Sequence, residues 1–347
     1  MPRSRQIARC AITAAAVTAL LAGCAGGAGP RNTDSIRIIL GHGAAPGNPR
    51  SNAALLFEKL VEEKSDDAID IQILGQETVG SDSEMMISVA SGTLDMTINS
   101  QGPFATYVPE AALIGLPFLF ENSQHAYAVI DSKEISGYLA KKAEERGFHL
   151  LGFWDNGMRD LTNSKHPIET PEDVAGLKIR TPDDTMTISI FNQLGANPTP
   201  MAFGELYLAL RTGAVDGQEN PVVNIKSSKL DEVQPNLAVT GHKYEANPFV
   251  ISTARWSRLT PEQRSILQEA ADEARASQRE EMSVQTRRIY EEFELKLAVT
   301  HPDKEAFRTL TAPVYDSWSA KFPEFFTTIT STADGLRSEY TQGDEAK

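Results

Sequence analysis

An arginine at the end of a short apolar run is the first candidate for binding chemistry. Residues 177–179 form the run, Arg180 follows it, and residues 181–184 (TPDD) combine a hydroxyl cap, a proline and two acids, as a helix start does. The pattern predicts strand, turn and helix, with Arg180 at the edge of the sheet where open α/β folds bind ligands. A guanidinium has a planar fork that matches a carboxylate and stays charged when desolvated. A surface ion pair is the alternative for an arginine taken alone.

Catalytic and metal motifs do not support an enzyme. The sequence has no HExxH, CxxC, P-loop or GxSxG pattern, and its six histidines are scattered without ligand spacing. The glycine loop 41–48 lacks the lysine of a P-loop and contains Pro46, so a plain turn is expected rather than a phosphate cradle. Glu219 could act as a general base, but no acid partner accompanies it. We therefore predict a protein without catalysis, cofactor or metal.

Three short sequence motifs in one stretch resemble motifs of the solute receptors of tripartite ATP-independent periplasmic (TRAP) transporters. They are GLKIR (176–180), GANPTPM (195–201) and DGQENP (216–221), in this order and spacing. In that family the arginine of GLKIR forms a two-pronged salt bridge with the substrate carboxylate. The resemblance implies this role for Arg180, with further ligand contacts at Phe203 and Asn220.

Other segments extend the resemblance over nearly all of the chain after residue 34. Residues 154–159 (WDNGMR) look like the element through which the family's chain enters the second lobe, which implies that Arg159 also lines the site. The tryptophan of this element either stacks on a sugar ring or, as is more usual at the end of a buried strand, belongs to the core.

Three polar residues of the first part of the chain complete the predicted ligand site. The loop that carries His42 faces the cleft in the family, so His42 either contacts the ligand or is structural, as a lone histidine more often is. Residues 78–82 (TVGSD) resemble the family's QLGSD segment with a changed start, so Asp82 either contacts ligand hydroxyls or serves the helix dipole. Ser100 follows the strand expected at 94–98 and points where a ligand would lie.

The N-terminus reads as an export signal. Arg3, Arg5 and Arg9 precede an apolar run at 11–22 that is too short to span a bilayer, and residues 21–24 (LAGC) match a bacterial lipobox. We expect a lipoprotein signal peptide at 1–23, lipid on Cys24, a flexible tether at 24–34 and an extracytoplasmic protein anchored to the membrane. An ordinary signal, with Cys24 incidental, is the alternative.

Removal of the predicted signal peptide changes the net charge and the cysteine count of the chain. Its three arginines leave with it, which takes the formal net charge from −14 to −17. Cys10 leaves too, so an acylated Cys24 would leave no thiol for a disulfide or zinc site. The acidity argues against nucleic acid and anionic membrane surfaces as partners, and an anionic solute would have to be attracted by local arginines.

Strands alternate with helices throughout, and the length exceeds one typical domain. We predict an α/β fold of the two-lobed periplasmic-binding-protein type (type II-like), with a hinge that allows closure around a solute. Lobe I should comprise 35–156 and 246–285, and lobe II should comprise 157–245 and 286–340. The chain would cross between the lobes near 154–159 and 237–242.

A long helix should follow residues 260–263 (TPEQ), a capped start with proline at the first helical position. Neither glycine nor proline recurs before Pro302. Roughly 35 residues at about 1.5 Å each reach about 50 Å, the breadth of two lobes. Receptors of the TRAP family have a long helix that bridges both lobes. Dimerisation through a coiled coil is the alternative, but the alanine-rich stripe has irregular heptads, so a monomer is expected.

Three functions of different classes are compatible with these features. The first and preferred one is a receptor that holds an organic acid between the lobes and delivers it to the small and large TRAP membrane subunits. Its polar candidates favour a sugar acid such as a uronate or aldonate over a C4-dicarboxylate or 2-oxo acid. The second is a lipoprotein that presents its ligand to a sensor kinase. The third is a secreted hydrolase, which turnover of a bound solute would support.

Overall fold

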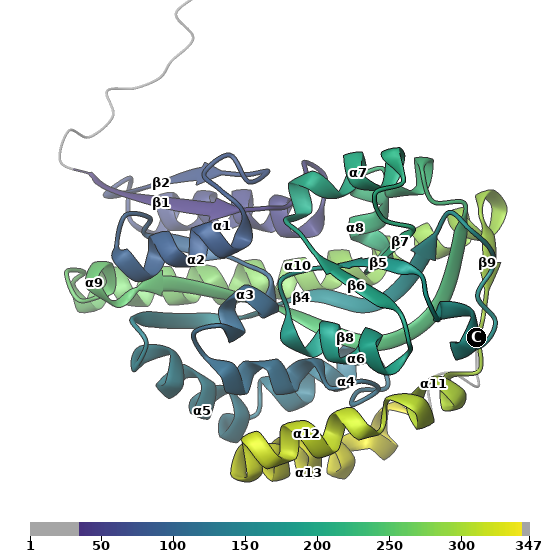
Figure 1. Ribbon diagram of the computed structural model, residues 1–347. Coiled ribbons are helices and arrows are strands. Elements are labelled where there is room, and N and C mark those ends of the chain that lie inside the picture. Colours follow the sequence, from purple (N-terminus) through teal and green to yellow (C-terminus); the bar gives the residue numbers. More distant parts are fainter. Residues whose placement is uncertain (1–34, 342–347) are drawn as a thin grey trace, which may run out of the picture.

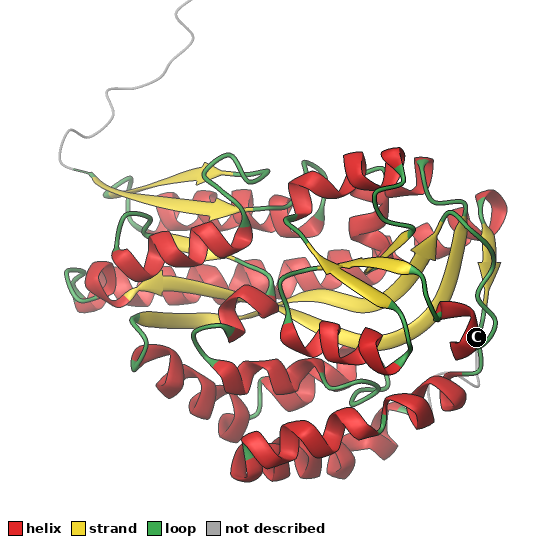
Figure 2. Cartoon of the chain, in the orientation of Figure 1, coloured by secondary structure: helices red, strands yellow, loops and turns green. Residues whose placement is uncertain are grey.

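The computed structural model describes residues 35–341, which form a mixed sheet with helices on both of its faces (Figures 1 and 2). The nine strands of this part of the chain are β1 (Ile36–His42), β2 (Ile69–Leu74), β3 (Met96–Ile98), β4 (Phe148–Asn163), β5 (Lys178–Thr181), β6 (Asn197–Pro200), β7 (Gly217–Asn220), β8 (Asn236–Ser252) and β9 (Ala298–Thr300). Their order across the sheet is β2-β1-β3-β8-β4-β7-β5-β6, and β9 pairs with β8.

The helices connect these strands and cover the sheet. The α-helices are α1 (Pro49–Lys64), α2 (Asp82–Ser91), α3 (Gln101–Ala105), α4 (Ser123–Ile130), α5 (Lys133–Glu144), α6 (Thr185–Gln193), α7 (Phe203–Thr212), α8 (Val222–Ser227), α9 (Thr253–Trp256), α10 (Pro261–Lys296), α11 (Lys304–Thr311), α12 (Pro313–Lys321) and α13 (Pro323–Tyr340). Three short 3₁₀ helices accompany them: η1 (Pro109–Gly115), η2 (Pro171–Val174) and η3 (Leu230–Glu232).

Two long antiparallel strands join the two halves of the molecule. β4 has 16 residues and β8 has 17, and they pair along most of their length, with register shifts that include one between Asp155 and Gly157. β1, β2 and β3 are parallel to one another on one side of this pair, and β5, β6 and β7 are parallel on the other. We call β1–β3 with α1 and α2 the β1 side, and β5–β7 with α6–α8 the β5 side. The segments 154–159 and 237–242, at which the chain was predicted to cross between lobes, are parts of these two continuous strands.

Helix α10 packs against both sides, as predicted. Its 36 residues begin at the expected capping box, in which Thr260 and Gln263 each bond the other's backbone N–H. Leu267 and Ala270 belong to the core of the β1 side, and Ile289 and Phe293 belong to the core of the β5 side. The buried stripe of this helix is therefore used within the chain itself, and the helix runs the width of the fold in Figure 1.

Trp154 is a core residue. It is 1 % exposed, and its ring packs edge-on against Phe249 with the centroids 5.2 Å apart. Of the two interpretations of this tryptophan, the structure supports burial in the core of the β1 side.

The helix start predicted at 181–184 is wrong. Thr181 is the last residue of β5, and Asp184 is the N-cap of α6, where its carboxylate accepts from the Met186 N–H at 3.0 Å and from the Thr187 hydroxyl at 2.6 Å. A residue that precedes proline is driven to extended backbone, so Thr181 stays in the strand. The cap moves to the first side chain beyond Pro182 that can reach the free N–H groups.

Within residues 35–341 no helix is both long enough and apolar enough to cross a bilayer. The predicted signal peptide, Cys24 and the tether lie outside the described residues.

Candidate ligand-binding site

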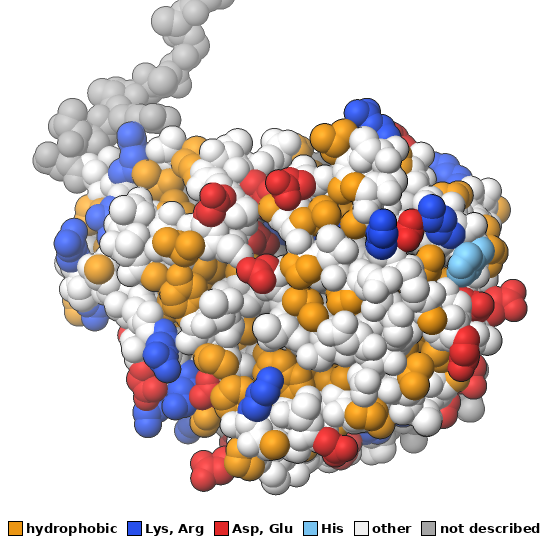
Figure 3. Space-filling model, viewed as in Figure 1, with side chains coloured by type: hydrophobic (Ala, Val, Ile, Leu, Met, Phe, Trp, Pro, Cys, Tyr) orange, Lys and Arg blue, Asp and Glu red, His pale blue; other side chains and the backbone are white. Residues whose placement is uncertain are grey.

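A cavity of about 230 Å³ lies where the β1 side meets the β5 side. Loops after β1, β2 and β3 supply one wall, β5, β7 and the turn before α7 supply the other, and β4 and β8 supply the floor. The lining residues are Gly43, Arg50, Glu77, Ser81, Asp82, Ser83, Ser100, Pro103, Asn156, Arg159, Arg180, Pro182, Asp183, Pro200, Met201, Ala202, Phe203, Asn220, Asn224 and Glu245. Acidic side chains are visible near the boundary of the two sides in Figure 3.

Arg180 is a buried cation with one edge of its guanidinium free. The residue is 3 % exposed, and its Nε and Nη2 both donate to the carbonyl oxygen of Met201, at 3.2 and 2.7 Å. Its Cζ lies 5.7 Å from the centre of the Phe203 ring. No carboxylate of residues 35–341 lies within 4 Å of it, and none of their acceptors takes a hydrogen bond from Nη1. Burial, together with the nearby Arg159, lowers the pKa of Arg180 to about 10, so the charge persists at neutral pH.

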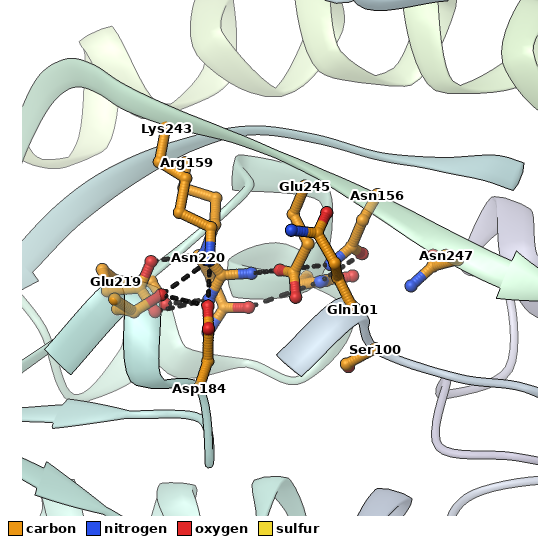
Figure 4. Close-up of polar contacts among 12 residues, drawn as sticks. Ser100, Gln101, Asn156, Arg159, Asp184, Glu219, Asn220, Lys243, Glu245 and Asn247 are labelled. Carbon is orange, nitrogen blue, oxygen red and sulfur yellow. Dashed lines mark hydrogen bonds and ion pairs between the residues drawn. The ribbon is translucent and has the colours of Figure 1, made fainter. Parts of the chain in front are cut away.

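Arg159, by contrast, is paired with two acids, and four of its five N–H groups donate to protein oxygens (Figure 4). Its Nη2 donates to Glu219 Oε1 at 2.7 Å and to the Glu219 carbonyl oxygen at 2.6 Å, its Nε pairs with the same carboxylate, and its Nη1 pairs with Glu245. Burial raises the pKa of Glu219, but Arg159 and His242 together outweigh burial and the pKa falls to about 2. Arg159 therefore lines the cavity with its charge already compensated by two acids.

Asn220 belongs to a chain of side-chain amides along the β5 side of the cavity. It donates to Gln218 at 2.6 Å and accepts from Asn224 at 3.4 Å. Asn224 also donates to Asn156 at 3.0 Å, and Asn156 donates to Glu245 at 2.9 Å. These bonds fix the amides that face the cavity.

Asp82 and Ser100 meet on the β1 side. The Ser100 hydroxyl and backbone N–H both donate to Asp82 Oδ2, and Asp82 Oδ1 is buried without a partner among the described residues. Ser81 and Glu84 form a capping box at the start of α2. Asp82 is thus in the first turn of α2, with its carboxylate directed to Ser100 at the cavity.

His42 does not line the cavity. It is 1 % exposed, and its Nδ1 accepts from the Ala44 N–H at 3.2 Å. Burial, assisted by Arg50, lowers the pKa of His42 to about 4, so the ring is neutral at neutral pH. The loop faces the cavity through Gly43 instead.

Contacts between the two sides close the cavity mouth. The Gly204 N–H, in the first turn of α7, donates to Glu77 Oε2 at 2.9 Å, and the Ser83 hydroxyl donates to Asp183 at 3.3 Å. A Cβ at Gly204 would lie 2.6 Å from that Glu77 oxygen, so only glycine allows this approach without a shift of the carboxylate.

Several cavity residues were not identified from sequence. Arg50 carried one signal, because a cation in the first turn of a helix opposes the helix macrodipole. Glu77 and Glu245 had none, since a single acid in a loop or strand is usually solvated. No group of three or more His, Cys, Asp or Glu side chains in the described part of the chain is arranged to hold a metal ion.

Comparison with known proteins identifies the family of this chain. The pattern of the family described as "Bacterial extracellular solute-binding protein, family 7" matches residues 40–321. An uncharacterized protein, y4mM of Sinorhizobium fredii, is 46% identical over 81% of this chain, which spans only 52% of that protein. The 2,3-diketo-L-gulonate-binding periplasmic protein YiaO of Escherichia coli is 38% identical over 65% of this chain and 69% of its own length.

Solved structures extend the likeness to the fold. The sugar acid binding protein DctPAm of Advenella mimigardefordensis, in complex with galactonate, has a TM-score of 0.84 and 32% identity over 88% of this chain and 99% of its own. A TRAP periplasmic solute-binding protein of Sulfurospirillum deleyianum with bound succinate has a TM-score of 0.81 and 27% identity over 85% and 98%. The chain therefore belongs to family 7 of the bacterial extracellular solute-binding proteins, the DctP family of TRAP periplasmic receptors.

Proposed function

We propose that this receptor captures a hydroxylated monocarboxylate, a sugar acid such as an aldonate or uronate, and delivers it to the small and large membrane subunits of a TRAP transporter. Members of the family are transport receptors, not enzymes, so the solute is released unchanged. Closure of the two sides around the solute and their separation for release would occur by bending at β4 and β8, the strands that join them.

Arg180 is the observation that carries the proposal. The Met201 carbonyl holds the Nε/Nη2 edge of the guanidinium, which leaves the Nη1/Nη2 edge open for the two oxygens of a carboxylate. A buried cation without an acid partner is costly, and a ligand anion would remove that cost. The Phe203 ring beside the guanidinium helps to hold it in the plane that a carboxylate requires.

The charge of the cavity favours one carboxylate over two. Arg50, Arg159 and Arg180 line it, and so do four acids, Glu77, Asp82, Asp183 and Glu245. Arg159 is in addition paired with Glu219 behind it. A monoanion can be neutralised at Arg180, whereas a second ligand carboxylate would lie among excess acids.

Unused acceptors favour hydroxyl groups on the ligand. Glu77 Oε1, Asp82 Oδ1 and Glu245 Oε1 are buried and have no hydrogen-bond partner among the described residues. Each could accept from a ligand hydroxyl, and a buried acceptor left unpaired is costly. Succinate has no hydroxyl to donate, and a sugar acid has several. The galactonate and succinate complexes of the two similar structures make both classes worth testing.

A thermal-shift screen over aldonates, uronates, C4-dicarboxylates and 2-oxo acids, followed by calorimetry, tests the proposal. Sugar acids should raise the melting temperature most, since a ligand that binds only the folded state stabilises it according to its concentration over its Kd. Stronger stabilisation by succinate or a 2-oxo acid would contradict the proposed ligand class. Absence of binding by every acid would contradict the receptor function as well.

The lipid anchor remains part of the proposal. Residues 21–24 (LAGC) support it, and a periplasmic location agrees with the family. Radiolabelled palmitate should be incorporated into the full-length protein in cells and should be lost in Cys24→Ala. Equal incorporation into the variant, or none into the wild type, would refute the anchor.

A further inference from the structure

Arg50 is a second buried guanidinium in the cavity wall, and it has no partner at all among residues 35–341. The residue is 5 % exposed, and its Nε and Nη1 are buried and donate to no acceptor in this part of the chain. No described carboxylate lies within 4 Å of it. Its position is fixed by its own backbone N–H, which donates to Asn48, the N-cap of α1, at 2.9 Å. The side chain lines the same cavity as Arg180, but from the β1 side.

This position is electrostatically unfavourable for a cation. Arg50 is the second residue of α1, a helix of 16 residues, and the free N–H groups of a helix N-terminus repel positive charge. Burial adds a desolvation cost that no ion pair within residues 35–341 offsets. A group that brings acceptor oxygens to Arg50 and to the N-terminus of α1 would remove both penalties.

Two acids beside Arg50 define what that group must be. A Cβ built on Gly43 would lie 3.3 Å from Asp82 Oδ1 and 3.5 Å from Glu77 Oε1, so these two unpartnered oxygens meet at the same point of the wall. Arg50 is also close enough to Glu77 to act on its charge. One wall therefore offers guanidinium donors next to carboxylate acceptors.

We propose that Arg50, Glu77 and Asp82 form a hydroxyl-binding subsite that holds the polyol chain of the ligand, while Arg180 holds its carboxylate. The inference rests on the proposed function and adds the orientation of the ligand: acid group toward the β5 side, hydroxyl groups toward the β1 side. A hydroxyl is the group that suits this wall, because it accepts from Arg50 and donates to Glu77 or Asp82 at the same time. A second carboxylate could accept from Arg50 but would be repelled by both acids.

The test compares ligands as well as variants. Affinities of D-galactonate, its 3-deoxy analogue, succinate and n-butyrate are measured by calorimetry, and those in the millimolar range by NMR titration, for the wild type, Arg50→Gln and Glu77→Gln. Arg50→Gln should weaken galactonate about tenfold to a hundredfold, because hydrogen bonds to a charged group are lost, and should change butyrate by less than twofold. Glu77→Gln should weaken galactonate and should strengthen succinate, because it removes a repelling charge.

The outcomes separate this subsite from the function itself. Equal loss of galactonate and butyrate in Arg50→Gln would make Arg50 the carboxylate anchor and overturn the proposed orientation. Unchanged galactonate binding in a folded Arg50→Gln would overturn the subsite while leaving the receptor function intact. If Arg50→Gln does not fold, Glu77→Gln and the galactonate to 3-deoxygalactonate ratio in the wild type decide, and equal affinity for these two ligands would overturn the subsite. Failure of every acid to bind the wild type would overturn the function and the subsite together.

Discussion

Replacement of Arg180 should cause a large loss of ligand affinity. Arg180→Ala removes a cavity arginine that is held by the Met201 carbonyl on one edge and is open on the other, so a bound carboxylate would lose its partner. Breaking a buried ion pair from one side costs about 3–5 kcal/mol, which corresponds to roughly a hundredfold to several-thousandfold in Kd. The affinity for the tightest sugar acid, measured by calorimetry, should fall by that factor.

A conservative variant and a matched control sharpen this experiment. Arg180→Lys keeps the charge, but its single nitrogen lacks the planar fork that matches both carboxylate oxygens, so at least a tenfold loss is expected, about 1.4 kcal/mol. Arg211→Ala removes an arginine of α7 that stacks on Tyr207 outside the cavity, and it should leave the affinity unchanged. Binding by Arg180→Ala within a few-fold of the wild type would refute the role of this guanidinium.

Three further predictions concern closure, folding and pH. Gly204→Ala should displace the Glu77 carboxylate from α7 and weaken ligand binding about tenfold, measured by calorimetry. The melting temperature should not fall, because alanine favours the helix. Unchanged affinity would show that this contact does not support closure. Glu219→Gln leaves Arg159 with one acid fewer and should destabilise the fold by about 3–5 kcal/mol in urea unfolding; a loss below 1 kcal/mol would contradict the structural role of this pair. The pKa of Glu219 is held at about 2, below its ordinary 4.5, so its stabilising effect is present above pH 4.5 and is lost as the pH falls toward 2. Glu219→Gln should therefore make the free energy of unfolding depend less on pH between 4.5 and 2. An unchanged pH dependence in this range would refute the lowered pKa of Glu219.

The sequence motifs grouped residues that line one wall of the cavity. Arg180, Phe203 and Asn220 were placed in a common site, and the structure brings them to one cavity because β5, the start of α7 and β7 are neighbours in space and close in sequence. Such short-range arrangements are encoded by local turns and by the pairing of adjacent strands, which a sequence pattern can reveal.

The sequence did not predict which side chains pair when they lie far apart in the chain. Arg159 was predicted beside the ligand, but the two acids that pair with it, Glu219 and Glu245, come from β7 and β8, 60 and 86 residues away. The opposite wall was only partly predicted: Arg50, in the first turn of α1, was not identified, and Gly43 lines the cavity in place of His42. His42 is the last residue of β1, and successive side chains of a strand point to opposite faces, so the direction of this side chain depends on the exact register.

The secondary structure shows the same difference between local and long-range signals. The long helix was predicted from its capping box and uninterrupted periodicity, and those signals are local. The start of α6 was predicted at 181–184, but Pro182 keeps Thr181 in extended backbone, so Thr181 ends β5 and Asp184 caps the helix. Both β4 and β8 run without a break through the lobe boundaries predicted at 156–157 and 245–246, so the residue bounds of the two lobes stay a prediction.

A crystal structure of the complex with the tightest-binding sugar acid tests the central claim most directly. The account predicts both carboxylate oxygens about 2.7–2.9 Å from the Nη1 and Nη2 atoms of Arg180, with the Met201 carbonyl still on its other edge. A carboxylate bound to Arg50 instead, with Arg180 in contact with protein groups alone, would contradict it.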